Sequence, residues 1–259
     1  MACSQLSVQL MSWALGVGGV AYLFHQQRHH TQYGRYQAAG TALPARLAWF
    51  LQELPSFLVP VLLLLGAGGA DTLPLPNALL LLMFCGHYFQ RTFVFSLLSN
   101  GRPTPLVIVA YAFAFCSYNG FLQGHQLLHC VAYPPWWHRD PRFIAGRKGT
   151  PWPGVLLFAL GMGINIHSDS ILRGLRRPGD THYSIPQGGL FELVSGANFL
   201  GEIVEWSGFA LASWSLPAAT FCIFTVCAIG PRAVHHHKFY LEKFKNYPKS
   251  RRALIPFLL

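Results

Sequence analysis

Residues 77–98 read NALLLLMFCGHYFQRTFVFSLL. A helix needs about 20 mostly apolar residues to cross the hydrocarbon core of a bilayer, and this stretch has that length. Outward from it lie six further apolar runs, at residues 6–24, 46–69, 105–131, 152–170, 195–214 and 216–230. We therefore expect an all-α membrane protein, a bundle of seven transmembrane helices that forms one domain over residues 1–259. The last run is short, which leaves open a helix that bends into the C-terminal segment.

Charged residues support the membrane assignment. They make up 11% of the chain, whereas soluble domains carry about a quarter. Of the Lys and Arg residues between the runs and in the tail, fourteen lie on the side of the C-terminus and four on the other side. This bias predicts a cytosolic C-terminus and a luminal N-terminus. The net charge of +10 follows this topology, so we expect no nucleic-acid binding. The first run lacks a basic leading segment, so we do not expect a cleavable signal peptide.

Three motifs invite an assignment that their context argues against. The six cysteines form no CxxC pair and most lie in apolar runs, so we expect free buried thiols. His235, His236 and His237 are consecutive and point about 100° apart on a helix, so we expect no metal site. Residues 16–21 match a GxGxxG/A fingerprint. No strand precedes them, and helix packing through small residues is the better interpretation.

Ionisable side chains at membrane depth are expensive and therefore indicate function. Glu53 interrupts the apolar stretch 49–55, and we expect it to face an internal cavity rather than a purely structural partner. His87, Tyr88 and Arg91 share one face of the third span. The phenol of Tyr88 is a suitable partner for Glu53, since the two together can polarise a carbonyl.

Residues 161–206 hold the richest set of polar groups. Asn165 and Asp169 are four apart, as are Asn198 and Glu202, so each pair lies on one helical face. A basic, glycine-rich loop joins the two helices. This arrangement suits a long anionic ligand that enters from the cytosol; a structural network of interhelical hydrogen bonds is the alternative. In the tail, the same four-residue spacing places Arg232, His236 and Tyr240 on one face.

These segments resemble the steroid 5α-reductases (3-oxo-5α-steroid 4-dehydrogenases), most of all the type 2 branch found in mammals. The matching stretches are long, occur in order and cover nearly the whole chain: residues 48–57, 87–93, 161–169, 185–191, 195–206 and 235–257. The resemblance implies a seven-helix bundle in the endoplasmic reticulum membrane, which acts as a monomer in steroid and lipid metabolism. There it would reduce the Δ4 bond of 3-oxo-Δ4-steroids such as testosterone with NADPH, a step of androgen biosynthesis and sexual differentiation.

The resemblance also implies roles for individual residues. Glu53 and Tyr88 would bind the C3 carbonyl of the steroid and act in catalysis. The cofactor would be bound mostly by the C-terminal part, residues 161–259, through Asn165, Asp169, Arg176, Tyr183, Asn198, Glu202, Arg232, His236 and Tyr240, with Tyr33, Gln52, Arg91 and Arg102 nearby. The pocket for steroid or nicotinamide would be lined by Phe115, Trp206 and Phe224.

The chain departs from the family at three places: an apparent insertion at residues 147–154, Ser184 in place of a basic residue, and Ala228 in place of an aromatic one. Three other functions compete with a steroid reductase. They are a membrane methyltransferase of the isoprenylcysteine type, a fatty-acyl enoyl reductase, and a steroid or lipid transporter. The first would carry paired glutamates where this chain has His236 and His237. The third would favour an inverted repeat, which we do not find.

Overall fold

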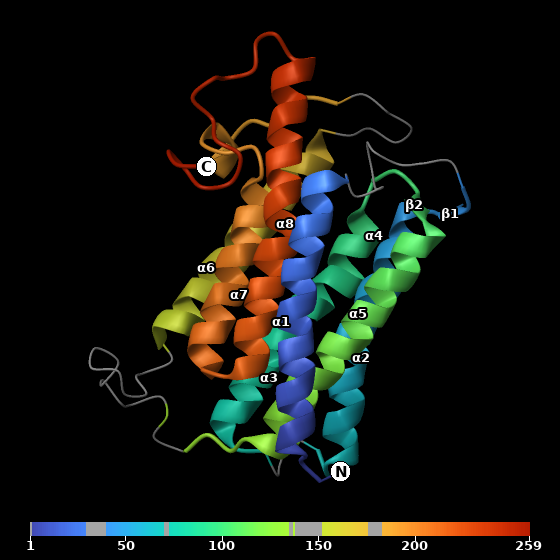
Figure 1. Cartoon of the computed structure of the whole chain (residues 1–259), viewed down its shortest axis with the longest axis vertical. Coiled ribbons are helices and arrows are strands. Elements are labelled where there is room, and N and C mark those ends of the chain that lie inside the picture. Colours follow the sequence, from blue (N-terminus) through green and yellow to red (C-terminus); the bar gives the residue numbers. More distant parts are fainter. Residues whose placement is uncertain (1, 30–39, 70–72, 135–136, 138–151, 176–182) are drawn as a thin grey trace.

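The computed structural model describes residues 2–29, 40–69, 73–134, 137, 152–175 and 183–259, and its helices lie side by side in one elongated bundle (Figure 1). The helices are α1 (Gln5–Arg28), α2 (Ala45–Gly66), α3 (Leu75–Phe89), α5 (Leu106–His125), α6 (Trp152–Gly174), α7 (Ala197–Ser213) and α8 (Leu216–Lys243). The π-helical turn η3 (Gln90–Phe95) and α4 (Ser96–Leu98) continue α3, and η4 (Gln126–Cys130) continues α5. A two-residue pair, β1 (Ala42–Leu43) with β2 (Thr104–Pro105), ties two connections together.

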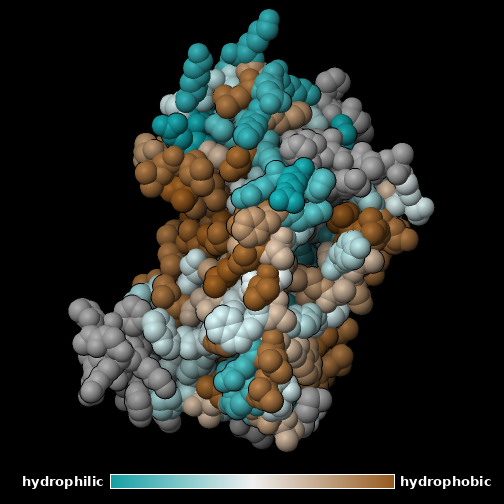
Figure 2. Space-filling model, in the orientation of Figure 1, coloured by the Kyte–Doolittle hydropathy of each residue, from teal (hydrophilic) through white to brown (hydrophobic). Residues whose placement is uncertain are grey.

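The outer surface of the bundle is apolar. Six helical segments are long and apolar enough to cross a membrane, and α7, with 17 residues, is slightly shorter. Large hydrophobic side chains are exposed along several helices, among them Leu10, Leu62, Leu82 and Leu156. Figure 2 shows hydrophobic side chains along the flanks of the molecule and hydrophilic ones gathered at its upper end. The prediction of an all-α, polytopic membrane protein is therefore confirmed.

The helix ends differ from the expected ones mainly at the C-terminus. The expected last span ended at residue 230, but α8 runs without a break to Lys243, with Pro231 inside it. Its second half therefore projects beyond the other helices at the end of the bundle that also carries the C-terminus (Figure 1). The alternative of a helix that continues into the C-terminal segment is thus the correct one. It places His236 and Tyr240 on a regular helix above the bundle.

Glycines bring α6 and α7 into close contact. A Cβ atom built on Gly161 would lie 2.6 Å from the carbonyl oxygen of Gly201, and one on Gly208 would lie 2.6 Å from that of Gly154. No larger residue fits between the two backbones at these positions. In lipid, where apolar side chains gain nothing by leaving their surroundings, such close packing is a main source of helix association. It fixes the polar faces of α6 and α7 against each other.

A disulfide corrects one prediction from the sequence. Cys3, just before α1, is bonded to Cys130 at the end of η4, whereas we expected free thiols; Cys85, Cys116, Cys222 and Cys227 are free as expected. The sequence separation of 127 residues hides a pairing that the antiparallel helices create by bringing both ends to one side of the bundle. His125 lies within 4.8 Å of both sulfur atoms, but the sulfurs are committed to each other rather than to a metal.

The C-terminal segment covers the start of α7. Its backbone pairs with residues before that helix, since Arg252 N–H donates to Leu193 and Ser195 N–H donates to Arg252. Arg251 donates to the carbonyl oxygen of Pro186 (2.7 Å) and to Glu192 (3.1 Å). The backbone N–H of Gly188 also donates to Glu192 and lowers the pKa of that carboxyl below its usual value. These bonds hold the segment around η6 (Gly189–Glu192) in place.

Candidate active site

Glu53 and Tyr88 lie on neighbouring helices, α2 and α3, inside the bundle. Tyr88 is 4% exposed, and its hydroxyl lies beside Ser56 and within electrostatic reach of Glu53. Ser56 donates to the carbonyl oxygen of Cys116 at 2.9 Å, and the Cys116 thiol lies 3.9 Å from Glu53. The phenol and the carboxyl group are thus both inside the bundle and within electrostatic reach of each other.

Arg91 connects Glu53 of α2 to Asp169 of α6. Its guanidinium donates to Asp169 of α6 at 2.8 Å and lies 4.0 Å from Glu53. It also stacks over the ring of Phe95, 4.0 Å from the ring centre. We call Glu53, Arg91 and Asp169 the charged array. All three side chains are largely buried, so each charge depends on the others rather than on water.

The polar faces of α6 and α7 meet next to this array. Asn165 donates to the backbone carbonyl of Asn198 at 3.0 Å, and the side chain of Asn198 lies at Asp169. Glu202, one turn further along α7, acts electrostatically on Glu53 and Arg91. The glycine contacts between the two helices make this approach possible. Four residues that the sequence singled out by spacing are therefore brought together.

The three aromatic residues that we expected to line a pocket belong to one aromatic cluster. Phe115 and Phe224 stack with ring centres 4.4 Å apart, and Phe221 lies between them and Trp206, 4.5 Å from the indole. Trp206 in turn lies 5.9 Å from Tyr88. The cluster thus adjoins the ring of Tyr88 through Trp206.

The remaining cofactor candidates lie towards the end of the bundle that carries the C-terminus. Arg102 stacks on Tyr183, and Arg232 and His236 both contact the ring of Phe199. Tyr240 stacks on Tyr247 with ring centres 5.3 Å apart. Gln52 is 6% exposed, and its side-chain nitrogen has no hydrogen-bond partner among the described residues. Tyr33 and Arg176 lie outside the described residues.

The structure adds one contact that the sequence did not suggest. His87 Nδ1 lies 2.7 Å from Glu205 Oε1, and both side chains are buried. The sequence predicts His87 on the same helical face as Tyr88 and indicates no role for Glu205.

Of the three departures from the family, Ser184 is exposed, and the backbone carbonyl of Ala228 accepts a bond from Gln26 of α1. Residues 147–151 lie outside the described part, and residues 152–154 begin α6.

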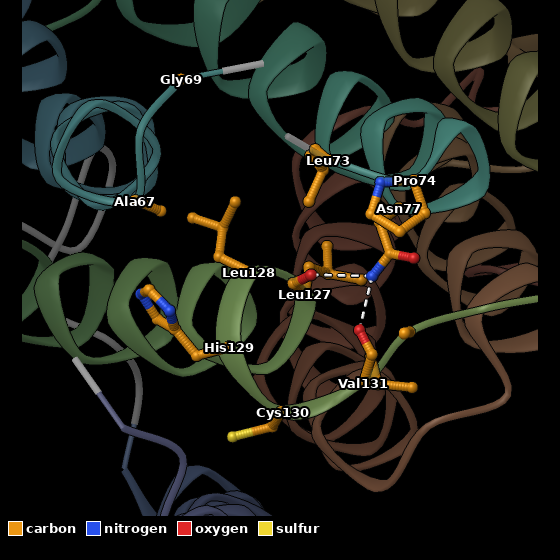
Figure 3. Close-up of a pocket in the computed structure, with 11 residues that line it drawn as sticks. Ala67, Gly69, Leu73, Pro74, Asn77, Leu127, Leu128, His129, Cys130 and Val131 are labelled. Atoms are coloured by element: carbon orange, nitrogen blue, oxygen red, sulfur yellow. Dashed lines mark hydrogen bonds between the residues drawn. The ribbon is translucent and has the colours of Figure 1, made fainter. Parts of the chain in front are cut away.

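A cavity of about 320 Å³ lies at the other end of the bundle, near the disulfide. Figure 3 shows the Asn77 side chain donating to the backbone carbonyls of Leu127 and Val131, at 2.8 and 2.7 Å. Its oxygen accepts a bond from the backbone N–H of Tyr133. We call these groups the Asn77 clamp. No titratable member of the charged array lines this cavity, so it is not our candidate active site.

Comparison with known proteins gives the family. Residues 102–259 match the family model described as 3-oxo-5-alpha-steroid 4-dehydrogenase. The chain is 53% identical to the porcine (Sus scrofa) 3-oxo-5-alpha-steroid 4-dehydrogenase 2, over 99% of this chain and 98% of the relative. It is 56% identical to the human (Homo sapiens) type 2 enzyme, over 87% of each chain, and 51% identical to the bovine (Bos taurus) type 1 enzyme, over 88% of this chain and 87% of the relative.

These similarities extend over nearly the whole chain and include every helix that contributes to the charged array. They set aside the methyltransferase, the enoyl reductase and the transporter. The chain belongs to the steroid 5α-reductase family, the 3-oxo-5α-steroid 4-dehydrogenases.

Proposed function

We propose that this protein reduces the Δ4 double bond of 3-oxo-Δ4-steroids with NADPH. The observation that carries the proposal is the placement of Tyr88 and Glu53. A phenol and a carboxyl group lie within electrostatic reach of each other inside an apolar bundle. Glu53 belongs to the charged array, and Tyr88 adjoins the aromatic cluster through Trp206. A steroid is a flat apolar body with a polar end, so an apolar cavity with one polar anchor suits it.

In the proposed reaction, Tyr88 donates a hydrogen bond to the C3 oxygen of the steroid. Negative charge develops on that oxygen as an enolate when the C5 position is reduced. A donor aimed at this oxygen stabilises the transition state more than the ground state, which is the condition for catalysis. Glu53 holds the phenol in place, and Arg91 keeps Glu53 from being an isolated buried charge. The surrounding helices exclude water, which strengthens each of these interactions.

The residues towards the C-terminal end suit NADPH, which supplies the hydride when bound. Arg102 and Arg232 offer guanidinium groups for phosphates. The side-chain nitrogen of Gln52, which has no partner in the part of the chain that the structure describes, offers a donor inside the bundle. Asn165, Asp169, Asn198 and Glu202 lie where α6 and α7 meet, next to the charged array. Since the described residues form no Rossmann unit, side chains on helices take over the binding and orientation of the cofactor.

The same arrangement supports a location in the endoplasmic reticulum membrane, with the N-terminus in the lumen and the C-terminus in the cytosol. Basic residues gather at the end of the bundle that carries the C-terminus, as the positive-inside rule requires. The disulfide between Cys3 and Cys130 lies at the opposite end, and disulfides persist in oxidising compartments such as the lumen. We propose that a monomer carries out the reaction, since the charged array and the aromatic cluster come from one chain.

The test is turnover by the purified protein in detergent or in lipid nanodiscs. Testosterone and NADPH are added, and the products are identified by mass spectrometry. We expect NADPH consumption matched by a 5α-reduced steroid, and no methyl transfer when S-adenosylmethionine replaces NADPH. A protein that folds and binds NADPH but forms no reduced steroid from testosterone or another 3-oxo-Δ4-steroid would contradict the proposal.

A further inference from the structure

The reaction consumes one proton besides the hydride, and none of the roles above supplies it. The buried pair His87 and Glu205 is the candidate group. His87 of α3 is 3% exposed and Glu205 of α7 is fully buried, and their side chains lie 2.7 Å apart. The second carboxylate oxygen, Oε2, is buried and has no hydrogen-bond partner in the part of the chain that the structure describes. Among the described residues, His87 is thus the hydrogen-bonding partner of the Glu205 carboxyl group.

The distance requires a proton between His87 Nδ1 and Glu205 Oε1, because two lone pairs would repel at this separation. A second proton on Nε2 makes the pair neutral as a whole, either as imidazolium with carboxylate or as imidazole with carboxylic acid. Without that proton the pair carries a net negative charge, which a low-dielectric interior disfavours. The resting pair therefore holds a proton on Nε2.

The position of His87 matches the place where the proton is needed. The C4 atom of a 3-oxosteroid is bonded to C3, so a donor to C4 must lie next to the group that holds the C3 oxygen. The imidazole of His87 lies 5.0 Å from the ring of Tyr88, in an edge-to-face arrangement, and 4.6 Å from the indole of Trp206. His87 is thus flanked by the proposed carbonyl anchor on one side and by the aromatic cluster on the other.

We propose that His87 delivers the proton from Nε2 to C4 of the steroid enolate and that Glu205 is the residue that positions His87. The inference rests on the proposed function of the same site. A C–H bond forms at C4, the Nε2–H bond breaks, and the electron pair of the enolate returns to form the C3 carbonyl. The negative charge passes from the steroid to the His87–Glu205 pair, which then takes up a proton from the aqueous side. The hydride at C5 and this proton account for both hydrogens that the steroid gains.

The test uses full-length protein in nanodiscs with testosterone and NADPH. His87→Gln keeps a polar side chain of similar size but removes the acid, and general acids contribute about 10²- to 10⁴-fold. We expect kcat to fall by about 10²-fold, while the affinity for NADPH and the KM for the steroid stay close to those of the unaltered protein. The solvent deuterium isotope effect on kcat should rise, because slow proton delivery from water becomes rate-limiting.

Glu205→Gln serves as the second variant, because its neutral amide no longer favours a proton on His87 Nε2. We expect the same fall in kcat and the same rise in the isotope effect, with Glu205→Asp recovering part of both. The matched control is Ser207→Ala, two residues along α7, where the hydroxyl donates to the carbonyl oxygen of Ile203 in its own helix and is hydrogen-bonded to Cys222 of α8. It should turn over like the unaltered protein.

Full turnover by His87→Gln would overturn the proposal, as would a fall in kcat with an unchanged isotope effect. If His87→Gln does not fold, the same two outcomes in Glu205→Gln decide. Failure of the parent proposal has a different signature, namely no reduced steroid from the unaltered protein or full turnover by Tyr88→Phe. An impaired Tyr88→Phe beside a fully active His87→Gln would reject only the role of His87.

Discussion

The charged array and the Asn77 clamp are both buried polar groups in a membrane bundle, but they are satisfied differently. The clamp is neutral, and within the described segments the Asn77 side chain bonds to backbone groups of Leu127, Val131 and Tyr133. In the charged array, Glu53, Arg91 and Asp169 have one another as partners. Backbone partners cannot move or be exchanged without unfolding, whereas side-chain partners can respond to a ligand. The difference indicates that the clamp holds the fold and the array serves the reaction.

Arg91→Ala should produce the largest effect and would break the array. It leaves the carboxylates of Asp169 and Glu53 without their cation, and removing one member of a buried ion pair costs about 3–5 kcal/mol. We expect a large drop in thermal stability in detergent together with loss of NADPH binding. The exposed Arg28 at the end of α1 provides the control, and Arg28→Ala should change neither. An Arg91→Ala protein as stable as the unaltered one would show that the array is not coupled.

Tyr88→Phe comes next and separates chemistry from stability. Loss of one donor to a developing oxyanion lowers kcat by about 10²- to 10³-fold, and Glu53→Gln should act in the same direction. Steady-state turnover and NADPH titration measure the effect. For Tyr88→Phe, which leaves the charged array intact, we expect cofactor affinity and melting temperature to stay close to those of the unaltered protein. Full steroid turnover in either variant would contradict the proposal that Tyr88 and Glu53 hold the C3 carbonyl of the steroid.

Cys3→Ala tests the end of the bundle that holds the clamp. It removes a disulfide that closes a long loop, which typically stabilises a fold by about 2–4 kcal/mol. We expect a lower melting temperature but unchanged turnover per folded molecule. Cys85→Ala, which removes a free thiol, is the matched control and should melt at a higher temperature than Cys3→Ala. Equal melting temperatures for the two variants would argue against the disulfide.

Asn77→Ala should have a smaller effect, again on stability alone. It removes the side-chain oxygen that accepts from the backbone N–H of Tyr133, and one such unsatisfied buried group costs about 1–3 kcal/mol. Thermal denaturation gives the loss, and turnover by the remaining folded protein should be nearly normal. A folded Asn77→Ala protein that cannot reduce steroid would contradict the inference that the clamp serves stability and only the array serves the reaction.

Arg102→Ala should have the smallest effect and would sharpen the assignment of the cofactor end. Loss of one partly exposed phosphate partner should weaken NADPH binding by about tenfold, which corresponds to about 1.4 kcal/mol. The KM for the steroid should stay the same, and Lys249→Ala, at an exposed position of the C-terminal segment, should leave both unchanged. Weaker steroid binding with unchanged NADPH affinity would contradict the assignment of Arg102 to cofactor binding.

Much of this molecule could be predicted from local sequence. The apolar runs mark the helices because a bilayer demands about 20 apolar residues for each span, and six of the seven expected segments end within a few residues of the observed helices. Four-residue spacing correctly placed Asn165 with Asp169 on α6, and the motifs around Glu53, Tyr88 and Arg91 indicated a site. The continuous α8 could not be predicted with certainty, since Pro231 and the basic tail resemble a helix end.

What the sequence by itself determined is therefore which segments are helices, which face of each is polar, and the family. Only the tertiary structure decided the partners: Arg91 with Asp169, His87 with Glu205, and Cys3 with Cys130. The physical reason is that the hydrophobic effect does not determine which helices pack together when all of them are surrounded by lipid. Neighbours are chosen by close backbone approach, as at Gly161 and Gly201, and by the pairing of buried polar groups, which appear only once the helices are packed.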